Sequence, residues 1–174
     1  HEFGYENFSK NQINSLIKLS KYLIKKYKIK ASNILGHSDI AFERKKDPGE
    51  KFPWGYLATK KIGIWHKIKE QQLKRYRSKK ISKIEIHTFI KYLSKIGYLT
   101  KNLKSNKKIK LFKSFQRRFR QELINGKIDK ECLIIAEKMS KISRWLFFLE
   151  KIQIMNILDE PDKWLIALIN FEEE

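Results

Sequence analysis

The chain has 174 residues, a formal net charge of +20 and a hydrophobic fraction of 41%. This length allows one ordinary domain or two small ones, and no apolar run is long enough to form a membrane-spanning helix. The single cysteine, Cys132, excludes an internal disulfide and is expected to be a plain buried thiol in a helix.

The excess of basic residues is typical of proteins that bind an anionic partner, nucleic acid above all. Lysine, however, greatly outnumbers arginine, and isoleucine is also used heavily. A genome rich in A and T produces this bias without selection for any partner. Charge alone is therefore weak support for a nucleic-acid-binding protein.

The first predicted element is a helix from Ser9 to about Lys28. Ser9 and Gln12 have the spacing of a capping box, in which each side chain bonds the other residue's backbone N–H. Apolar residues recur at helical spacing and form one face: Ile13, Leu16, Ile17, Leu23, Ile24 and Tyr27.

A short apolar run over residues 33–36 predicts a buried strand, which places His37 at the strand's end. Residues 36–54 then form a long loop with one histidine, four acidic residues, four basic residues and two prolines. Pro48 and Pro53 exclude a helix through this stretch. A long ordered loop of this chemistry is more typical of a functional site than of a spacer.

His37 and Asp47 lie ten positions apart, so the loop can fold both side chains onto one ion. An imidazole nitrogen and a carboxylate oxygen suit zinc. The alternative is a histidine satisfied by backbone groups and an aspartate that caps a turn. Spacing alone favours this alternative, because a single His/Asp pair is a weak signal.

The residue pattern of the whole loop favours the metal-binding alternative. Its residues 36–54 follow the pattern G-H-x-D-I-A-P-x-R-K-x-D-P-G-x-x-F-P-W, with Phe42 in place of the first proline. This pattern closely resembles the zinc loop of the N-acetylmuramoyl-L-alanine amidases, the group that includes the anhydro-muramyl amidases and, more distantly, the peptidoglycan recognition proteins.

The resemblance implies that His37 and Asp47 bind Zn²⁺ and that Lys45 faces the metal as a catalytic residue, where an ammonium group stabilises the oxyanion of a tetrahedral intermediate. Arg44 is a candidate for binding substrate. Phe52 and Trp54 either line the substrate groove or pin the loop to the core. Asp39 is expected to hold the loop by accepting backbone hydrogen bonds.

The family also needs an upstream zinc-binding histidine and a general-base glutamate. We therefore expect the chain to be the C-terminal portion of a longer amidase, lacking the N-terminal part, and to hydrolyse the muramoyl-alanine bond weakly or not at all when alone. His1 and Glu2 are not favoured as replacements, because a chain terminus is usually mobile. His66 and His87 lie outside the motif.

Residues 54–59 are expected to form a short helix, and residues 1–65 to complete the amidase part. Residues 66–80 carry many basic residues and few apolar ones, which indicates a basic linker with a helical turn near residues 70–76. The alternative for this segment is an anion-binding strip.

Three helices are predicted over residues 81–141: one ending at Gly97, one over residues 107–121, and one starting at Asp129 as N-cap. The core sequence F-Q-R-R-F-R, from Phe115 to Arg120, resembles the small three-helix peptidoglycan-binding domain that is often attached to these amidases. Phe115 and Phe119 are expected in its core. Residues 142–174 predict two further apolar helices.

The expected fold class is thus an α/β amidase-type fragment, with a helix, a strand and the zinc loop of a mixed-sheet domain, followed by a mainly helical region. The expected function is a zinc-dependent peptidoglycan amidase of the bacterial cell envelope, acting on peptidoglycan or muropeptides, with no nucleic acid as partner. The alternative is a non-catalytic peptidoglycan-binding remnant.

Overall fold

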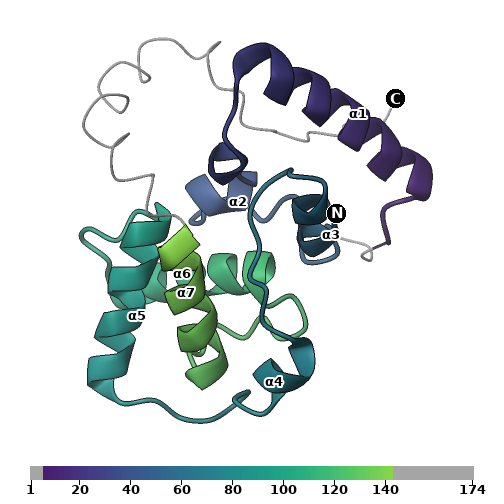
Figure 1. The fold of residues 1–174 in the computed structure, drawn as a ribbon. Coiled ribbons are helices and arrows are strands. Elements are labelled where there is room, and N and C mark those ends of the chain that lie inside the picture. The colour runs from purple at the N-terminus through teal and green to yellow at the C-terminus, as the bar shows by residue number, and fades with distance from the viewer. Residues whose placement is uncertain (1–5, 143–174) are drawn as a thin grey trace.

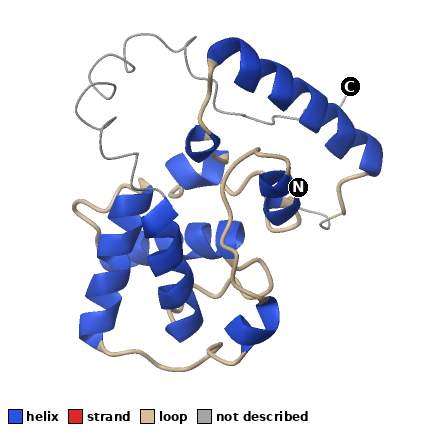
Figure 2. Ribbon diagram, in the orientation of Figure 1, coloured by secondary structure: helices blue, strands red, loops and turns tan. Residues whose placement is uncertain are grey.

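The computed structural model describes residues 6–142. Helices account for all the regular structure in that range, and the short helix α2 lies between α1 and the group formed by α5, α6 and α7 (Figures 1 and 2). The elements in order are α1 (Lys10–Tyr27), a 3-10 helix (Ala31–Asn33), α2 (His37–Ile40), α3 (Trp54–Thr59), α4 (Glu70–Lys74), α5 (Lys83–Ile96), α6 (Ser105–Phe119) and α7 (Lys130–Ile142).

The predicted mixed-sheet class is wrong for residues 6–142, which contain no strand. In place of the strand over residues 33–36, the Asn33 N–H donates to the Lys30 carbonyl at 2.9 Å and the Ile34 N–H to the Ala31 carbonyl at 3.3 Å. A strand needs a neighbouring strand to satisfy its backbone. Because residues 6–142 contain no such neighbour, local turns satisfy the backbone of residues 33–36 instead, and His37 begins a helix and does not end a strand.

Helix α1 forms as predicted. The Gln12 N–H donates to Ser9 Oγ at 3.2 Å, and the Ser9 N–H donates to Gln12 Oε1 at 2.8 Å, which completes the capping box. Leu16 on its apolar face packs into a small cluster that we call the N-terminal core. The buried residues of this core are Leu16, Ile34, Phe52, Trp54, Leu57 and Ile62.

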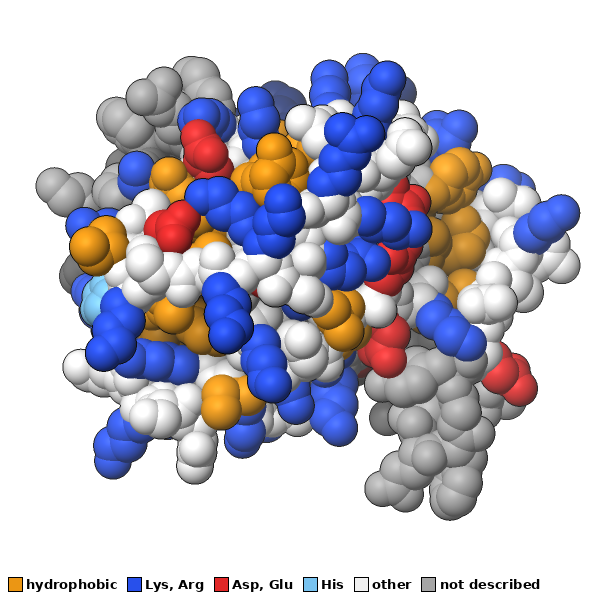
Figure 3. Space-filling model, turned by 90° about the horizontal axis from the view of Figure 1, so that it is seen from below, with side chains coloured by type: hydrophobic (Ala, Val, Ile, Leu, Met, Phe, Trp, Pro, Cys, Tyr) orange, Lys and Arg blue, Asp and Glu red, His pale blue; other side chains and the backbone are white. Residues whose placement is uncertain are grey.

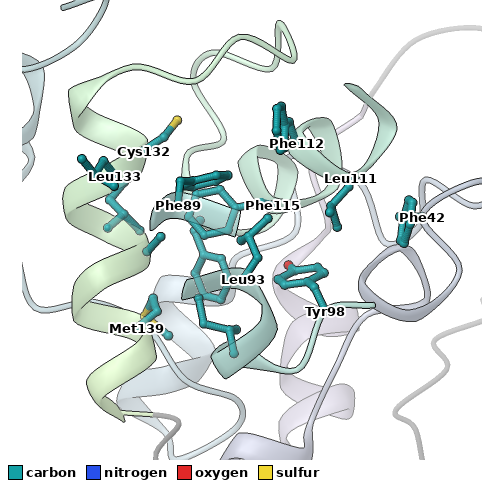
Figure 4. Close-up of a cluster of buried hydrophobic side chains, with 14 of the residues drawn as sticks. Phe42, Phe89, Leu93, Tyr98, Leu111, Phe112, Phe115, Cys132, Leu133 and Met139 are labelled. Atoms are coloured by element: carbon teal, nitrogen blue, oxygen red, sulfur yellow. The ribbon is translucent and has the colours of Figure 1, made fainter. Parts of the chain in front are cut away.

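The second cluster, the helical core, lies among α5, α6 and α7 (Figure 4). The three predicted helices are all present, and Gly97 ends α5 in the left-handed region with φ of 109°. Asp129 caps α7, because its Oδ1 accepts the Cys132 N–H at 3.0 Å. Phe115 and Phe119 are buried as expected, and burial raises the pKa of the Cys132 thiol to about 12.

Two polar members of F-Q-R-R-F-R, Gln116 and Arg120, hold the connection from α6 to α7. Gln116 accepts the Gly126 N–H and donates to the Lys127 carbonyl, both at 2.8 Å. Arg120 Nη1 lies 2.5 Å from Asp129 Oδ2. These side chains serve the fold of the helical region and are buried within it.

The segment predicted as a basic linker packs along the helical region. It contains α4, within the stretch predicted for a helical turn, and Leu73 of this helix is buried in the helical core. Arg77 donates to both carboxylate oxygens of Glu131 at 2.8 Å and to Glu122 at 2.5 Å. These acidic partners lie about fifty residues further along the chain, so the composition of the segment alone does not reveal them.

The helices predicted over residues 142–174 lie outside the described residues except for Ile142, and so do His1 and Glu2. Over residues 6–142, every helix is too short or too polar to cross a membrane.

Candidate metal site

The metal loop, residues 36–54, starts with a tight turn at Gly36, just before α2. The Gly36 N–H donates to Asp39 Oδ2 at 2.7 Å, which closes the first turn of α2 and fulfils the expected role of Asp39. A Cβ atom at Gly36 would lie 2.8 Å from Pro48 Cδ and 3.2 Å from Trp54 Cζ2. Only glycine allows the start of α2 to pack this closely against the second half of the loop.

His37 and Asp47 meet as the sequence predicts. His37 Nδ1 lies 3.1 Å from Asp47 Oδ2. Their backbones are also joined, because the Ser38 N–H donates to the Asp47 carbonyl at 2.9 Å. The side chains are 17% and 40% exposed, respectively, so the pair lies where a ligand from solvent can reach it.

This geometry fits two ligands of one zinc ion. Two donors on a tetrahedral ion, each at about 2.0–2.1 Å from it, lie about 3.3 Å apart. The observed separation of 3.1 Å between Nδ1 and Oδ2 is close to that value. No set of three or more His, Cys, Asp or Glu side chains suited to a metal occurs within residues 6–142, so this range supplies two donors.

Arg44 and Lys45 lie on the turn that follows α2. The amide N–H groups of both residues donate to the Ala41 carbonyl, at 3.0 and 2.9 Å. Arg44 is exposed and Lys45 half-buried. Neither forms an ion pair with a carboxylate in the described part of the chain, so both cations can meet an anionic group of a ligand.

Phe52 and Trp54 are 1% and 3% exposed and belong to the N-terminal core. Their ring centroids lie 4.7 Å apart with an edge-to-face geometry. The Phe52 carbonyl also accepts a hydrogen bond from Gln121 Nε2 at 2.7 Å. This burial favours the second of the two alternatives, in which both aromatic residues pin the loop to the core.

The remaining described histidines lie elsewhere, as expected. His66 is buried, its Nε2 lies 3.3 Å from the Phe119 carbonyl, and burial lowers its pKa. His87 is exposed on α5, with Nδ1 at 2.8 Å from the Lys83 carbonyl.

Sequence reasoning missed the residues of the helical region that contact the loop. Asp39 accepts hydrogen bonds from Tyr98 Oη at 2.8 Å and from Arg118 Nη1 at 2.6 Å. Arg118 lies three residues after Phe115, on the apolar face of α6, which is a signal for a buried charge. The sequence holds no signal that names Asp39 as the partner.

Phe42 was also missed. It stands where the resembling pattern has proline, and its side chain is buried in the helical core. In Figure 4 it lies on the same side of the cluster as Leu111. The only departure from the pattern in this loop is therefore an anchor to the helical region.

Comparison with known proteins agrees with this reading of the loop. Residues 1–50 match the family model described as N-acetylmuramoyl-L-alanine amidase. The chain is 34% identical over 133 residues to N-acetylmuramoyl-L-alanine amidase AmiD of Escherichia coli, which covers 76% of this chain and 48% of that protein. It is 51% identical over 43 residues to the 1,6-anhydro-N-acetylmuramyl-L-alanine amidase AmpD of Enterobacter cloacae, covering 25% and 23% of the two chains.

Two solved structures are similar in fold. The first is E. coli AmiD in complex with the substrate anhydro-N-acetylmuramic acid-L-Ala-D-γ-Glu-L-Lys, with a TM-score of 0.70, 32% identity, and coverage of 81% of this chain and 55% of that chain. The second is AmpDh3 from Pseudomonas aeruginosa in complex with anhydromuramic pentapeptide, with a TM-score of 0.66, 28% identity, and coverage of 80% and 55%.

The sequence and fold matches together show that the chain is similar to N-acetylmuramoyl-L-alanine amidases. The family model covers residues 1–50, and the match to AmiD extends the similarity over 133 residues. The chain spans about half the length of AmiD, the curated relative that it matches over most of its own length.

Proposed function

We propose that this chain is part of a peptidoglycan amidase that hydrolyses the amide bond between N-acetylmuramic acid, or its anhydro form, and the L-alanine of the stem peptide. The observation that carries the proposal is the approach of His37 Nδ1 to Asp47 Oδ2, at 3.1 Å, in a loop that matches the amidase family. The muropeptides bound by AmiD and AmpDh3 support the same substrate class.

In this proposal His37 and Asp47 hold Zn²⁺ together with groups from outside residues 6–142. When bound, Zn²⁺ polarises the scissile carbonyl and lowers the pKa of water. Lys45 donates a hydrogen bond to the oxygen on which negative charge develops. Arg44, exposed on the same turn, binds a carboxylate of the stem peptide, for which a guanidinium is well suited.

The domain organisation belongs to the same proposal. Residues 1–65 are the C-terminal part of the amidase domain, residues 66–80 connect it to the helical region, and residues 81–141 form a peptidoglycan-binding-like domain. Such a protein works in the bacterial cell envelope.

A second candidate is a peptidoglycan-binding protein without activity. It is favoured by the presence of only two suitable metal donors at the loop in the described range, since zinc at catalytic sites usually takes three protein ligands. A nucleic-acid binder has only the charge in its support. Figure 3 shows lysine and arginine side chains spread over one face, interrupted by apolar and acidic ones.

Zinc titration tests the metal site. We expect binding of Zn²⁺ to the 174-residue chain to be lost in His37→Ala and Asp47→Ala, measured by isothermal titration calorimetry. His87→Ala is the matched control, because this exposed histidine lies outside the loop, and it retains binding. Zinc binding that survives His37→Ala contradicts the assignment.

Muropeptide assays separate the two candidates. The chain is incubated with anhydro-N-acetylmuramyl-L-Ala-D-γ-Glu-L-Lys and zinc, and peptide release is followed by mass spectrometry. Slow hydrolysis that falls about a hundredfold or more in Lys45→Met supports the amidase. Binding of the muropeptide without any hydrolysis, by a chain that also fails to bind Zn²⁺ through His37 and Asp47, supports the binding protein.

A pull-down assay tests the nucleic-acid-binding candidate. Retention on purified peptidoglycan at raised salt supports either wall-directed function. Retention only on DNA, with the steep loss at raised salt that phosphate contacts produce, supports the nucleic-acid binder.

A further inference from the structure

Arg118 of α6 contacts residues on both sides of His37, one through its backbone and one through its side chain. Its Nη2 donates to the Ile34 carbonyl, before the histidine, at 3.1 Å. Its Nη1 donates to Asp39 Oδ2, after the histidine, at 2.6 Å. One guanidinium thus bridges the two ends of the turn that carries the imidazole.

Two further side chains of the helical region act on the same turn. Ser114 Oγ, one helical turn before Arg118, donates to the Ser38 carbonyl at 2.6 Å. Tyr98 Oη donates to Asp39 Oδ1 at 2.8 Å, so both oxygens of this carboxylate are bonded to the helical region.

The same turn carries the contact to the second candidate ligand. The Ser38 N–H donates to the Asp47 carbonyl at 2.9 Å, while the Ser38 carbonyl accepts from Ser114. A shift of Ser38 therefore moves His37 relative to Asp47. The separation of the two metal donors depends on a peptide unit that α6 holds in place.

Arg118 has little freedom to move. Its side chain is 2% exposed, and its guanidinium carbon lies 3.8 Å from the centroid of the Trp54 ring. Removing one partner of a buried ion pair is costly, because the remaining charge is left buried without a partner. Phe42, buried in the helical core, ties the other end of α2 to the same region.

We propose that Arg118 is a positioning residue of the metal site, which holds His37 against Asp47 through its contacts with Ile34 and Asp39. The helical region then also shapes the metal site, in addition to the peptidoglycan-binding-like role proposed for it above. The positioning rests on these contacts alone, and its consequence for metal binding rests on the proposed function.

Hydrogen exchange of the metal-free chain tests the positioning. In Arg118→Lys the charge remains, but an ammonium group cannot bond the carbonyl and the carboxylate in the fork geometry of a guanidinium. We expect exchange at the Ser38 amide to rise about tenfold, measured by NMR relative to the Ile135 amide in the core of α7. Tyr98→Phe, which removes one hydroxyl, raises it less.

Arg120→Lys is the matched control. Arg120 lies two residues further along, is equally buried, and pairs with Asp129 within the helical region. We expect it to change the ratio of Ser38 to Ile135 exchange by less than about twofold. Equal ratios in the Arg118 and Arg120 variants overturn the proposal.

Zinc affinity separates this inference from the proposed function. We expect the Kd for Zn²⁺ to rise about tenfold in Arg118→Lys and to stay unchanged in Arg120→Lys, as for other residues that orient metal ligands. Faster Ser38 exchange in a chain that binds no zinc keeps the positioning and refutes the metal site. Zinc binding that needs His37 but ignores Arg118→Lys refutes the positioning role.

Discussion

The two regions of the molecule differ in how much apolar side chain each buries. Among the described residues, the helical core contains fifteen buried members and the N-terminal core six. The larger cluster even includes Phe42 from the metal loop. The candidate chemistry thus lies in the region with the smaller core, while the larger one supplies its anchors.

This difference shows how a loop rich in charged residues becomes ordered. A loop gains little from burial of its own side chains, so a rigid neighbour must fix it. Here the fixing groups are a buried aromatic ring, Phe42, and the buried ion pair between Asp39 and Arg118. We therefore expect substitutions that destabilise the helical core to disturb the metal loop as well. Substitutions in the N-terminal core should affect the helices of the other region less.

The largest effect is expected from Phe115→Ala. Phe115 is fully buried, with its ring centroid 5.1 Å from Phe89 and 5.3 Å from Phe119. The cavity lowers the free energy of unfolding by about 3–5 kcal/mol, measured by urea denaturation. Leu16→Ala in the N-terminal core costs about 2 kcal/mol and leaves amide protection in α7 unchanged. Equal costs for the two variants break the comparison.

Next is Phe42→Ala, which tests the anchor between the regions. The Phe42 side chain is 7% exposed in the helical core, so its truncation lowers the free energy of unfolding by about 3 kcal/mol. Thermal unfolding measures this change. Phe42→Leu keeps most of the apolar volume and costs less than about 1.5 kcal/mol. Similar stability of the two variants means that the ring contributes little to joining the regions.

Gly36→Ala tests the packing within the loop. The added Cβ meets Pro48 Cδ at 2.8 Å and pushes the segment with Asp47 away from His37, at a cost of about 1–3 kcal/mol. Weaker zinc binding accompanies this loss. Gly55→Ala is the control, because its Cβ has a nearest neighbour at 3.3 Å in Trp65, away from the pair. A Gly36 variant with normal zinc affinity contradicts the prediction.

The smallest effect is expected from pH at the junction of the regions. Burial holds the pKa of His66 below its ordinary value of 6.5. As pH falls through about 6.5 the unfolded chain takes up a proton and the folded chain resists, so the free energy of unfolding decreases between pH 7.5 and 5.5. His66→Gln reduces this decrease in urea titrations, while His87→Gln, at an exposed site, leaves it unchanged.

The predictions that hold from the sequence are mostly local. The capping box at Ser9 and the glycine at position 97 set helix ends through bonds within three or four residues, so they can be recognised without the fold. The loop motif named two side chains that do meet, His37 and Asp47.

What the sequence does not predict are contacts between residues that lie far apart along the chain. The strand over residues 33–36 required a neighbour that residues 6–142 do not provide. The contacts of Arg77 in the basic segment with Glu122 and Glu131 join residues about fifty positions apart, so no local pattern predicts them.

The amino-acid sequence by itself determined most of the helices and their caps, because these follow from periodicity and short-range hydrogen bonds, and the resemblance of its loop to the amidase pattern implied the candidate ligands. Only the tertiary structure decided that Arg118 meets Asp39 across 79 positions and that Phe42 enters the core of the helical region. Such pairs are chosen by the packing of whole helices, which brings distant groups together and removes the water that would otherwise satisfy their charges.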